Sequence, residues 1–253
     1  MDKIITAERV SRDASDNYVF QRSLLAYHVA TERIHGEVLE IGTGAGYGIE
    51  VIAPHATHFV TIDKRKPTGL KFPPQVEFQK ACVPPLPFAD HSFDYVISFQ
   101  VIEHIRYDHD FICEVKRVLR PGGQFIVSTP NRKMSLTRNP WHVREYTADE
   151  FQQMLRCEFT EVEALGVFGN EKIMTYYEQN RRGVERITRY DIFQLQRHMP
   201  RFLLKIPYDI LNRINRHRLL SDNNDLTRSI TRDDYYMAPV ADNCFDLFYI
   251  ATK

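Results

Sequence analysis

Two kinds of apolar pattern alternate along the first half of this chain. From Glu37 to Asn131, short apolar runs of the length of buried strands are separated by segments whose apolar residues recur at helical spacing. The first, second, fourth and fifth expected strands end at Leu39, Asp63, Ser98 and Ser128. Strands that alternate with helices in this way predict an α/β fold with a parallel sheet and right-handed crossovers.

The pattern outside this stretch predicts elements that flank the sheet. Tyr18 to Ile34 carries apolar residues at helical spacing, and we expect a helix that covers the sheet edge. A capping-box-like start at Thr147–Glu150 opens another helix. Residues 160–167 and 244–251 are expected to be the last two strands, and residues 168–243 separate them. A connection of that length inside a compact domain is usually functional.

A glycine-rich loop follows the first expected strand. Gly42, Gly44 and Gly46 alternate with other residues, and Glu40 precedes them. Glycines let the backbone approach a ligand and adopt positive φ, and the N-terminus of a following helix offers free N–H donors. The spacing is not the dinucleotide fingerprint G-x-G-x-x-G, whose last glycine would fall on Tyr47. An acidic residue beside the loop suits a cationic ligand better than a pyrophosphate, and S-adenosylmethionine has that charge.

This loop and three later motifs resemble those of the class I S-adenosylmethionine-dependent methyltransferases. The later motifs are Phe59–Asp63, an LPF…FD segment at Leu86–Asp94 that continues into Glu103–His104, and Arg120–Ser128. The segments Thr129–Arg132 and Asn139–Tyr146 resemble the quinone-biosynthesis and cell-surface-glycan types of that family. The resemblance implies a Rossmann-like, doubly wound, mostly parallel seven-stranded sheet with a helical insertion before the last strand. It also implies S-adenosyl-L-methionine as cofactor and S-adenosyl-L-homocysteine as product.

One methyltransferase domain is therefore expected over residues 1–253. Its parts are an N-terminal helical segment (1–36), a cofactor-binding core (37–167), a helical cap (168–243) and the last strand (244–253).

The resemblance also implies which residues hold the cofactor. Glu40 and the glycine loop would anchor its amino-acid tail, and Asp63 would bind the ribose hydroxyls. Lys64 stands where the family often has a small or apolar residue, and its aliphatic stem could cover the adenine. Gln100, at the end of the fourth strand, could contact the methionine portion or make only a local hydrogen bond.

The expected adenine contact departs from the family pattern. Cys82, followed by Val83, stands where an aspartate commonly reads the adenine amino group. A thiol is a poor hydrogen-bond acceptor. Either Asp90 or a backbone carbonyl replaces the aspartate, or adenine specificity is weaker.

Two histidines are candidate catalytic residues. His104 could accept a proton from an acceptor hydroxyl, because the imidazole pKa suits that task. Its structural alternative is to hold the loop of Glu103 against the next strand. His142 lies in the polar loop 139–146, which should follow the fifth strand over the cofactor crevice.

The loop 139–146 also offers candidate acceptor contacts, namely Trp141, Arg144 and Tyr146. Long polar loops at this edge of a sheet usually carry substrate residues. The alternative is a loop held in place by packing of Trp141 and an ion pair of Arg144 with Glu145. No third ligand joins His142 and Glu145 at a convincing metal-site spacing, so no metal is expected.

The amino-acid composition limits which kinds of partner and which compartment are expected for the protein. The chain has 33 Lys and Arg and 33 Asp and Glu, so a formal net charge of zero gives no overall attraction to nucleic acid or to anionic membranes. Its four cysteines are scattered and favour a reduced, cytoplasmic protein. The N-terminus has no apolar region of a secretory signal, and no apolar run approaches the length of a membrane-spanning helix. The oligomeric state is left open.

The stretch Arg201–Arg218 inside the cap is basic and amphipathic. We expect it to be helical and to border the acceptor pocket. It could be a lid helix that packs its apolar face on the domain, or it could lie peripherally on an anionic membrane.

These observations lead to one functional hypothesis and two alternatives. We expect methyl transfer from S-adenosylmethionine, by direct in-line displacement, to an oxygen of a small-molecule or glycan-like acceptor. The lean toward oxygen rests on the family resemblance alone. The alternatives are a non-catalytic cofactor-binding interaction protein and a protein or RNA methyltransferase. The neutral charge and Ser98–Val101, in place of an amino-methylation motif, speak against nucleic acid.

Overall fold

The structure is a computed structural model that describes residues 13–189, 199–222 and 224–253. Residues 1–12 of the expected N-terminal segment, and residues 190–198 and 223 of the expected cap, lie outside the described residues.

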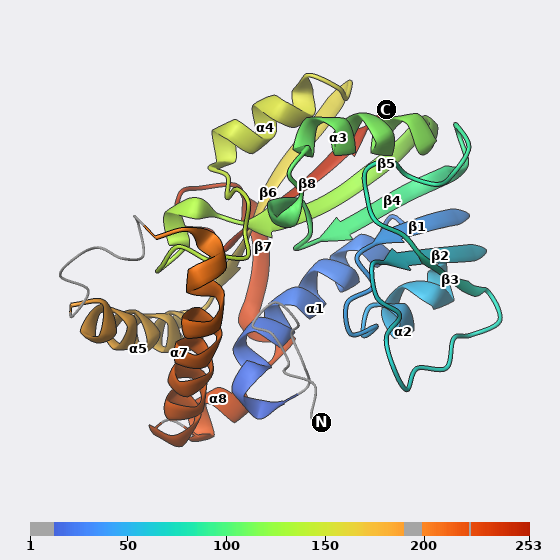
Figure 1. Cartoon of the computed structure of the whole chain (residues 1–253). Helices are drawn as coiled ribbons and strands as arrows, with labels where there is room; N and C mark the ends of the chain where they lie inside the picture. Colours follow the sequence, from blue (N-terminus) through green and yellow to red (C-terminus); the bar gives the residue numbers. More distant parts are fainter. Residues whose placement is uncertain (1–12, 190–198, 223) are drawn as a thin grey trace.

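A single twisted sheet forms the centre of the molecule (Figure 1). Its strands are β1 (Glu37–Ile41), β2 (His58–Asp63), β3 (Val76–Lys80), β4 (Phe93–Phe99), β5 (Leu119–Pro130), β6 (Glu161–Gly169), β7 (Tyr235–Pro239) and β8 (Asp246–Thr252). The order is β3-β2-β1-β4-β5-β8-β6-β7. Strands β1 to β5 pair in parallel, whereas β8 is antiparallel to β5 and β6. The doubly wound, mostly parallel fold is thus confirmed.

The number of strands differs from the expected seven, because the segment 168–243 is not entirely helical. It contributes β7, which pairs antiparallel with residues 165–169 at the open edge of β6. Strand β6 accordingly extends two residues beyond Val167, to Gly169. An unpaired edge offers backbone hydrogen bonds to any segment that returns beside it, and here the end of the insertion uses them.

Helices cover both faces of the sheet (Figure 1). Helices α3 (Asp108–Val118) and α4 (Ala148–Arg156) pack into one apolar cluster, and α1 (Asn17–Thr31) and α2 (Ile49–Ile52) pack into another on the opposite face. The predicted capping box is confirmed: Thr147 and Glu150 bond reciprocally at the start of α4.

The described residues also form short 3₁₀ helices, namely η1 (Ala14–Asp16), η2 (Ala53–His55), η3 (Ile102–His104), η4 (Arg132–Met134) and η5 (Arg232–Asp234).

The insertion lies beyond the carboxyl ends of β4 and β5, where the arrowheads in Figure 1 point. Its described helices are α5 (Glu171–Thr188), α7 (Arg201–Asp222) and α8 (Asn224–Ser229). The prediction that residues 201–218 are helical is confirmed. A third apolar cluster, which includes Tyr18, Tyr176, Leu219 and Phe245, joins these helices to α1 and to the approach to β8. The cap therefore shares a core with the sheet domain and covers its carboxyl edge.

None of the helices formed by the described residues combines the length and the hydropathy needed to cross a bilayer.

Candidate active site

The glycine loop between β1 and α2 has the backbone that its sequence predicted. Gly42, Gly44 and Gly46 have φ of 100°, 55° and 82°. A Cβ on Gly42 would lie 2.4 Å from Val101 Cγ2, and one on Gly46 would lie 2.0 Å from Leu70 Cδ1. At Gly44 the nearest atom to such a Cβ is 3.9 Å away. The middle of the loop thus faces open space that a ligand can enter and that a side chain would fill.

Asp63, the last residue of β2, lies against this loop. Its Oδ2 accepts a hydrogen bond of 3.0 Å from the backbone N–H of Gly44, and its Oδ1 accepts one of 2.9 Å from that of Arg65. The neighbouring Lys64 is exposed. The carboxylate therefore stands beside the open face of Gly44, as the parallel pairing of β1 with β2 requires.

Glu40 lies beneath the loop, with 2% of its surface exposed. Tyr27 Oη in α1 donates a 2.7 Å hydrogen bond to Glu40 Oε1, and Thr61 Oγ1 in β2 donates to Oε2. Burial raises the pKa of Glu40 to about 7, although both hydrogen bonds act in the opposite direction. Glu40 thus ties α1 to the sheet directly under the expected cofactor loop.

Replacing Glu40 with glutamine should change how stability depends on pH. In the native protein the pKa of Glu40 lies near 7, above its ordinary 4.5, so the stability it contributes is lost as pH rises through 7. Glutamine cannot ionise. Relative to the natural protein, Glu40→Gln should therefore gain about 3 kcal/mol in free energy of unfolding between pH 5 and pH 8. Urea denaturation at both pH values measures this, and a difference that stays constant with pH would contradict it.

Gln100 occupies the turn at the carboxyl end of β4, with a φ of 57°. Its backbone N–H donates to Ser128 O at 2.9 Å, and its Nε2 lies 3.4 Å from Ser128 Oγ. Of the other residues expected near the adenine, Cys82 is exposed and Val83 packs against the core. Gln100 is thus fixed at the edge where ligands collect in open α/β sheets.

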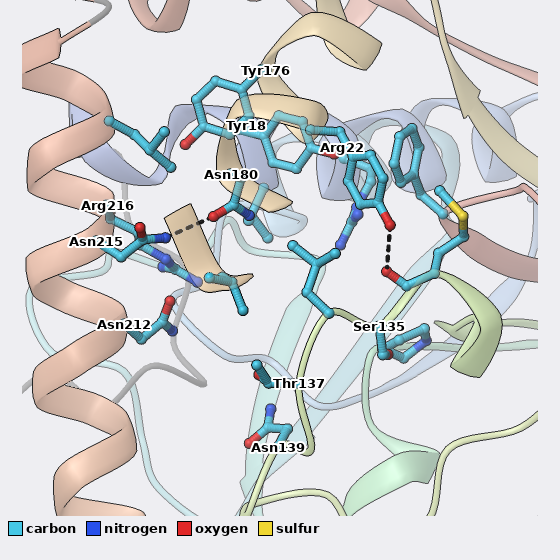
Figure 2. Close-up of a pocket in the computed structure, with 18 of the residues that line it drawn as sticks. Tyr18, Arg22, Ser135, Thr137, Asn139, Tyr176, Asn180, Asn212, Asn215 and Arg216 are labelled. Atoms are coloured by element: carbon cyan, nitrogen blue, oxygen red, sulfur yellow. Dashed lines mark hydrogen bonds between the residues drawn. The ribbon is translucent and has the colours of Figure 1, made fainter. Parts of the chain in front are cut away.

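A cavity of about 230 Å³ lies between the carboxyl edge of β5 and the cap. Figure 2 shows Asn212, Asn215 and Arg216 projecting from α7 into the space that Asn180 of α5 also faces. Asn215 Nδ2 donates to Asn180 Oδ1 at 2.7 Å. Other lining side chains come from α1 and from the loop that follows β5. The lining is rich in amides, hydroxyls and aromatic rings.

A buried ion pair forms the floor of this region, and sequence reasoning missed it. Arg22 Nε in α1 lies 2.9 Å from Asp246 Oδ2 at the start of β8, and the side chains are 16% and 5% exposed. Burial raises the pKa of Asp246, whereas Arg22 and Gln100 act in the opposite direction. The two partners stand at opposite ends of the sequence, so no local pattern could have paired them.

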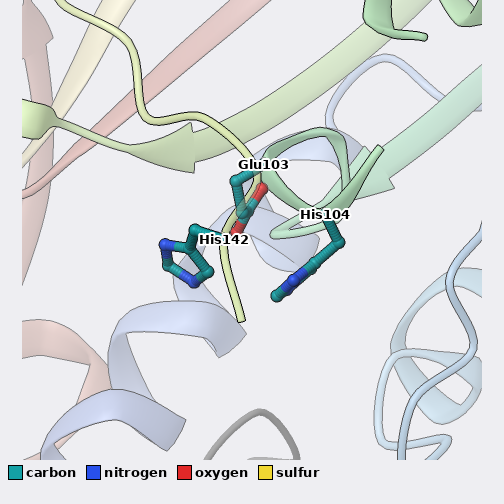
Figure 3. Close-up of side chains that lie close together, drawn as sticks. All are labelled: Glu103, His104 and His142. Carbon is teal, nitrogen blue, oxygen red and sulfur yellow. The ribbon is translucent and has the colours of Figure 1, made fainter. Parts of the chain in front are cut away.

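Glu103, His104 and His142 meet beside the cavity (Figure 3). Glu103 is 1% exposed, and its Oε2 accepts a 3.1 Å hydrogen bond from Thr129 Oγ1. Its backbone carbonyl accepts a 2.6 Å bond from the N–H of Val143. Burial raises the pKa of Glu103 to about 7. The role of holding this loop to the next strand was expected of His104, but it is Glu103 that bonds to Thr129 of β5 and to Val143.

His104 is influenced by charges from both the glycine-loop side of the site and the cap. Its Nδ1 lies 3.2 Å from Trp141 O, and its ring centroid lies 4.9 Å from that of His142. Burial, together with the charges of His142, Lys64 and Lys205, lowers its pKa to about 4, although the hydrogen bond to Trp141 O acts in the opposite direction. Lys64 follows β2 on the glycine-loop side, whereas Lys205 belongs to α7. The imidazole is therefore neutral at pH 7.

Both ring nitrogens of His142, which lines the cavity, contact other groups of its own loop. Nδ1 lies 2.6 Å from Glu145 Oε1, and Nε2 lies 2.7 Å from Asn139 Nδ2. Ligand atoms of Glu103, His104 and His142 lie within 4.8 Å of one another, a spacing that a metal ion could bridge. Sequence reasoning did not see this group, because it considered Glu145 and not Glu103 as the carboxylate. The expectation of no metal stays a prediction.

The three expected acceptor residues have structural partners instead, and none lines the described cavity. Tyr146 is fully buried, and its hydroxyl donates to Asp108 Oδ2 at 2.8 Å. Arg144 lies over the Tyr146 ring and 3.3 Å from the same carboxylate. Trp141 Nε1 donates to Asp209 of α7 at 3.0 Å. Trp141 therefore couples the loop to the cap.

These features define a class of protein. A parallel sheet carries a positive-φ glycine loop after β1, a carboxylate at the end of β2 and a covered cavity over its carboxyl edge, as in Rossmann-like enzymes that bind a nucleoside cofactor. Residues 39–127 match the family model described as a methyltransferase domain.

Similar proteins make the assignment specific. The chain is 33% identical to a probable S-adenosylmethionine-dependent methyltransferase of Mycolicibacterium smegmatis, over 98% of this chain and 95% of that protein. It is 28% identical to the phthiotriol/phenolphthiotriol dimycocerosates methyltransferase of Mycobacterium leprae, over 53% and 52% of the two chains. The phosphoethanolamine N-methyltransferase 2 of Haemonchus contortus, in complex with S-adenosyl-L-methionine, shares the fold, with a TM-score of 0.55 and 18% identity over 92% of this chain and 52% of that one. The chain belongs to the S-adenosylmethionine-dependent methyltransferases.

Proposed function

We propose that this enzyme transfers the methyl group of S-adenosylmethionine to a hydroxyl oxygen of a small-molecule or glycan-like acceptor bound in the cavity beneath the cap. The observation that carries the proposal is the neutral imidazole of His104, whose ring lies 4.9 Å from that of His142 in the wall of a polar cavity. No metal takes part in this proposal.

The residues around the glycine loop fit the cofactor. The open face of Gly44 would receive its amino-acid tail, and Asp63 would bind the ribose hydroxyls. The carboxylate of Asp63 suits a ligand that carries a positive charge, and Glu40 lies beneath the same loop. When bound, S-adenosylmethionine supplies an electrophilic methyl group. We place Lys64, Cys82 and Val83 along the adenine, and Gln100 beside the methionine portion.

We assign the proton acceptor to His104. The contact of Nδ1 with the carbonyl of Trp141 favours the tautomer with hydrogen on Nδ1, which carries its lone pair on Nε2. Nε2 would take the hydroxyl proton as the oxygen bonds to the methyl group. The depressed pKa keeps Nε2 unprotonated at neutral pH. His142, with both nitrogens engaged by Glu145 and Asn139, would position the loop.

The lining supports a hydroxyl as acceptor. Its charged side chains already have partners: Arg22 pairs with Asp246 and Arg216 with Asp16. Glu145 contacts His142, so the neutral amides supply the remaining polar contacts. The amides of Asn180, Asn212 and Asn215 can each donate to and accept from a hydroxyl. The M. leprae relative supports the same chemistry, since its name denotes a triol acceptor.

The test is transfer from cofactor labelled with ¹³C in the methyl group to fractions of an extract from the source organism. The carbon shift of the product separates O-methyl from N-methyl and C-methyl groups. We expect an O-methyl product from a small molecule or glycan. An N-methyl or C-methyl product would contradict the proposal, as would label in protein or RNA, or cofactor binding without transfer to any fraction.

A cavity variant connects the product to the proposed pocket. With the identified acceptor, Asn212→Leu should raise KM about 5- to 30-fold, because one hydrogen-bonding group is lost and its partner is left unpaired. S-adenosylhomocysteine affinity should stay unchanged in calorimetry. Gln153→Leu on the exposed face of α4 serves as the matched control. An unchanged KM in Asn212→Leu would place the acceptor elsewhere.

A further inference from the structure

Helix α7 exposes a row of large apolar side chains to solvent. Phe202, Ile206, Ile210 and Ile214 follow one another at intervals of four residues and are 69%, 72%, 53% and 57% exposed. Residues four apart lie on one side of a helix, so these four form a continuous stripe. Among the described residues ten large apolar side chains are exposed, and six of them belong to α7, which also contributes Leu203 and Leu211. Isolated exposed apolar residues are ordinary, but a contiguous patch marks an interaction site.

The opposite side of the same helix is already packed. Asn215 and Leu219 are 8% and 7% exposed, and both line the cavity. Asp209 and Arg201 bind the loop after β5, through Trp141 Nε1 and Val143 O. A lid that covers the cavity needs only this inner side. The exposed stripe therefore has no role in holding the cap on the domain.

Basic side chains accompany the stripe. Arg213, His217 and Arg218 are exposed on α7. The acidic residues of α7 are Asp209, which accepts the hydrogen bond of Trp141 Nε1, and Asp222, the last residue of the helix. We define the outer face of α7 as Phe202, Leu203, Ile206, Ile210, Arg213, Ile214, His217 and Arg218. It combines a wide apolar surface with positive charge, and the carboxylate of Asp13, beside η1, lies near Arg213 and His217.

We propose that the outer face of α7 docks on an anionic lipid bilayer, with the helix lying in the plane of the interface. Apolar side chains of such a helix enter the boundary of the acyl chains, and arginines stay among the anionic headgroups. A second copy of the chain is a poorer occupant, because two basic faces would repel each other. The cavity is lined by the inner side of the same helix. If the proposed O-methylation holds, the enzyme would therefore bind at the bilayer an acceptor that is attached to a lipid.

Flotation of the full chain with vesicles tests docking without any acceptor or methyl transfer. We expect binding to vesicles of phosphatidylcholine mixed with phosphatidylglycerol, and weaker binding to pure phosphatidylcholine or at high salt. Ile206→Asp/Ile210→Asp should weaken binding about ten-fold or more, because both side chains would leave the acyl boundary. Arg213→Glu/Arg218→Glu should weaken it by a similar factor.

Two matched controls separate docking from general surface effects. Met174→Asp changes an exposed apolar residue of α5, and Arg156→Glu reverses an exposed charge on α4, and both should bind vesicles as the natural chain does. All variants should keep S-adenosylhomocysteine affinity and melting temperature. No vesicle binding by the natural chain would overturn the proposal, as would equal binding to neutral and anionic vesicles. A dimer in sedimentation that the Ile206→Asp/Ile210→Asp variant abolishes would assign the face to a second copy instead. The O-methyl product is measured separately, so each proposal can fail without the other.

Discussion

Gly44→Val should abolish measurable binding of S-adenosylhomocysteine, a loss of at least about 100-fold in affinity. Gly44 has a φ of 55°, and the space over its Cα is open to 3.9 Å. A valine Cβ would occupy the place that we assign to the cofactor tail, and a β-branched residue strongly disfavours positive φ. A 100-fold loss corresponds to about 2.7 kcal/mol, which one steric overlap in a close backbone contact supplies. Isothermal calorimetry with the folded variant measures it.

The matched control is Gly122→Val. Gly122 has a φ of 77°, and a Cβ at this position would meet no atom within 4 Å. A valine at Gly122 therefore has the same backbone strain and the same open surroundings as a valine at Gly44. Gly122 lies within β5, far from the carboxyl edge of the sheet. We expect a similar loss of melting temperature in both variants and a loss of cofactor binding only in Gly44→Val. Retained affinity in a folded Gly44→Val protein would show that the loop does not hold the cofactor.

His104→Ala should lower kcat by about 10²- to 10⁴-fold, the usual contribution of a positioned general base. S-adenosylhomocysteine affinity should be unchanged, because we assign His104 to the proton and not to the cofactor. The natural enzyme should lose activity as pH falls through about 4, since burial lowers the pKa of His104 to that value and only the neutral ring accepts a proton. Steady-state kinetics with the identified acceptor at several pH values check both statements.

A structural role for His104 predicts a different result. Its contact with Trp141 O could hold the loop 139–146, in which case His104→Ala would lower the melting temperature and raise KM more than it lowers kcat. Added imidazole would restore activity only if the missing group is the base. His109→Ala, an exposed histidine of α3, controls for unrelated effects of losing an imidazole. An unaltered kcat in a folded His104→Ala protein would remove the base assignment.

Local sequence was enough for the elements whose signals are local. The glycine loop, the carboxylate at the end of β2 and the capping box of α4 each occupy a few consecutive residues, and the structure has all three. Apolar runs and helical spacing likewise predicted the alternation of strands and helices from Glu37 to Asn131, although no run was assigned to β3. The helix over 201–218 followed from the same periodicity. In each case the residues that interact are neighbours in the chain or lie within one turn of a helix.

Features that depend on contacts between segments far apart in the chain could be seen only in the tertiary structure. Strand β7 forms because residues 235–239 arrive beside the open edge of β6, although the sequence placed them in a helical cap. Tyr146 was expected at the acceptor and is instead buried in the core, where Asp108 at the start of α3 accepts the hydrogen bond of its hydroxyl. Arg22 and Asp246 meet across nearly the whole chain. The amphipathic pattern of α7 predicted that one side of the helix is apolar. It did not predict which side packs on the domain, because burial depends on the surface that the rest of the fold presents.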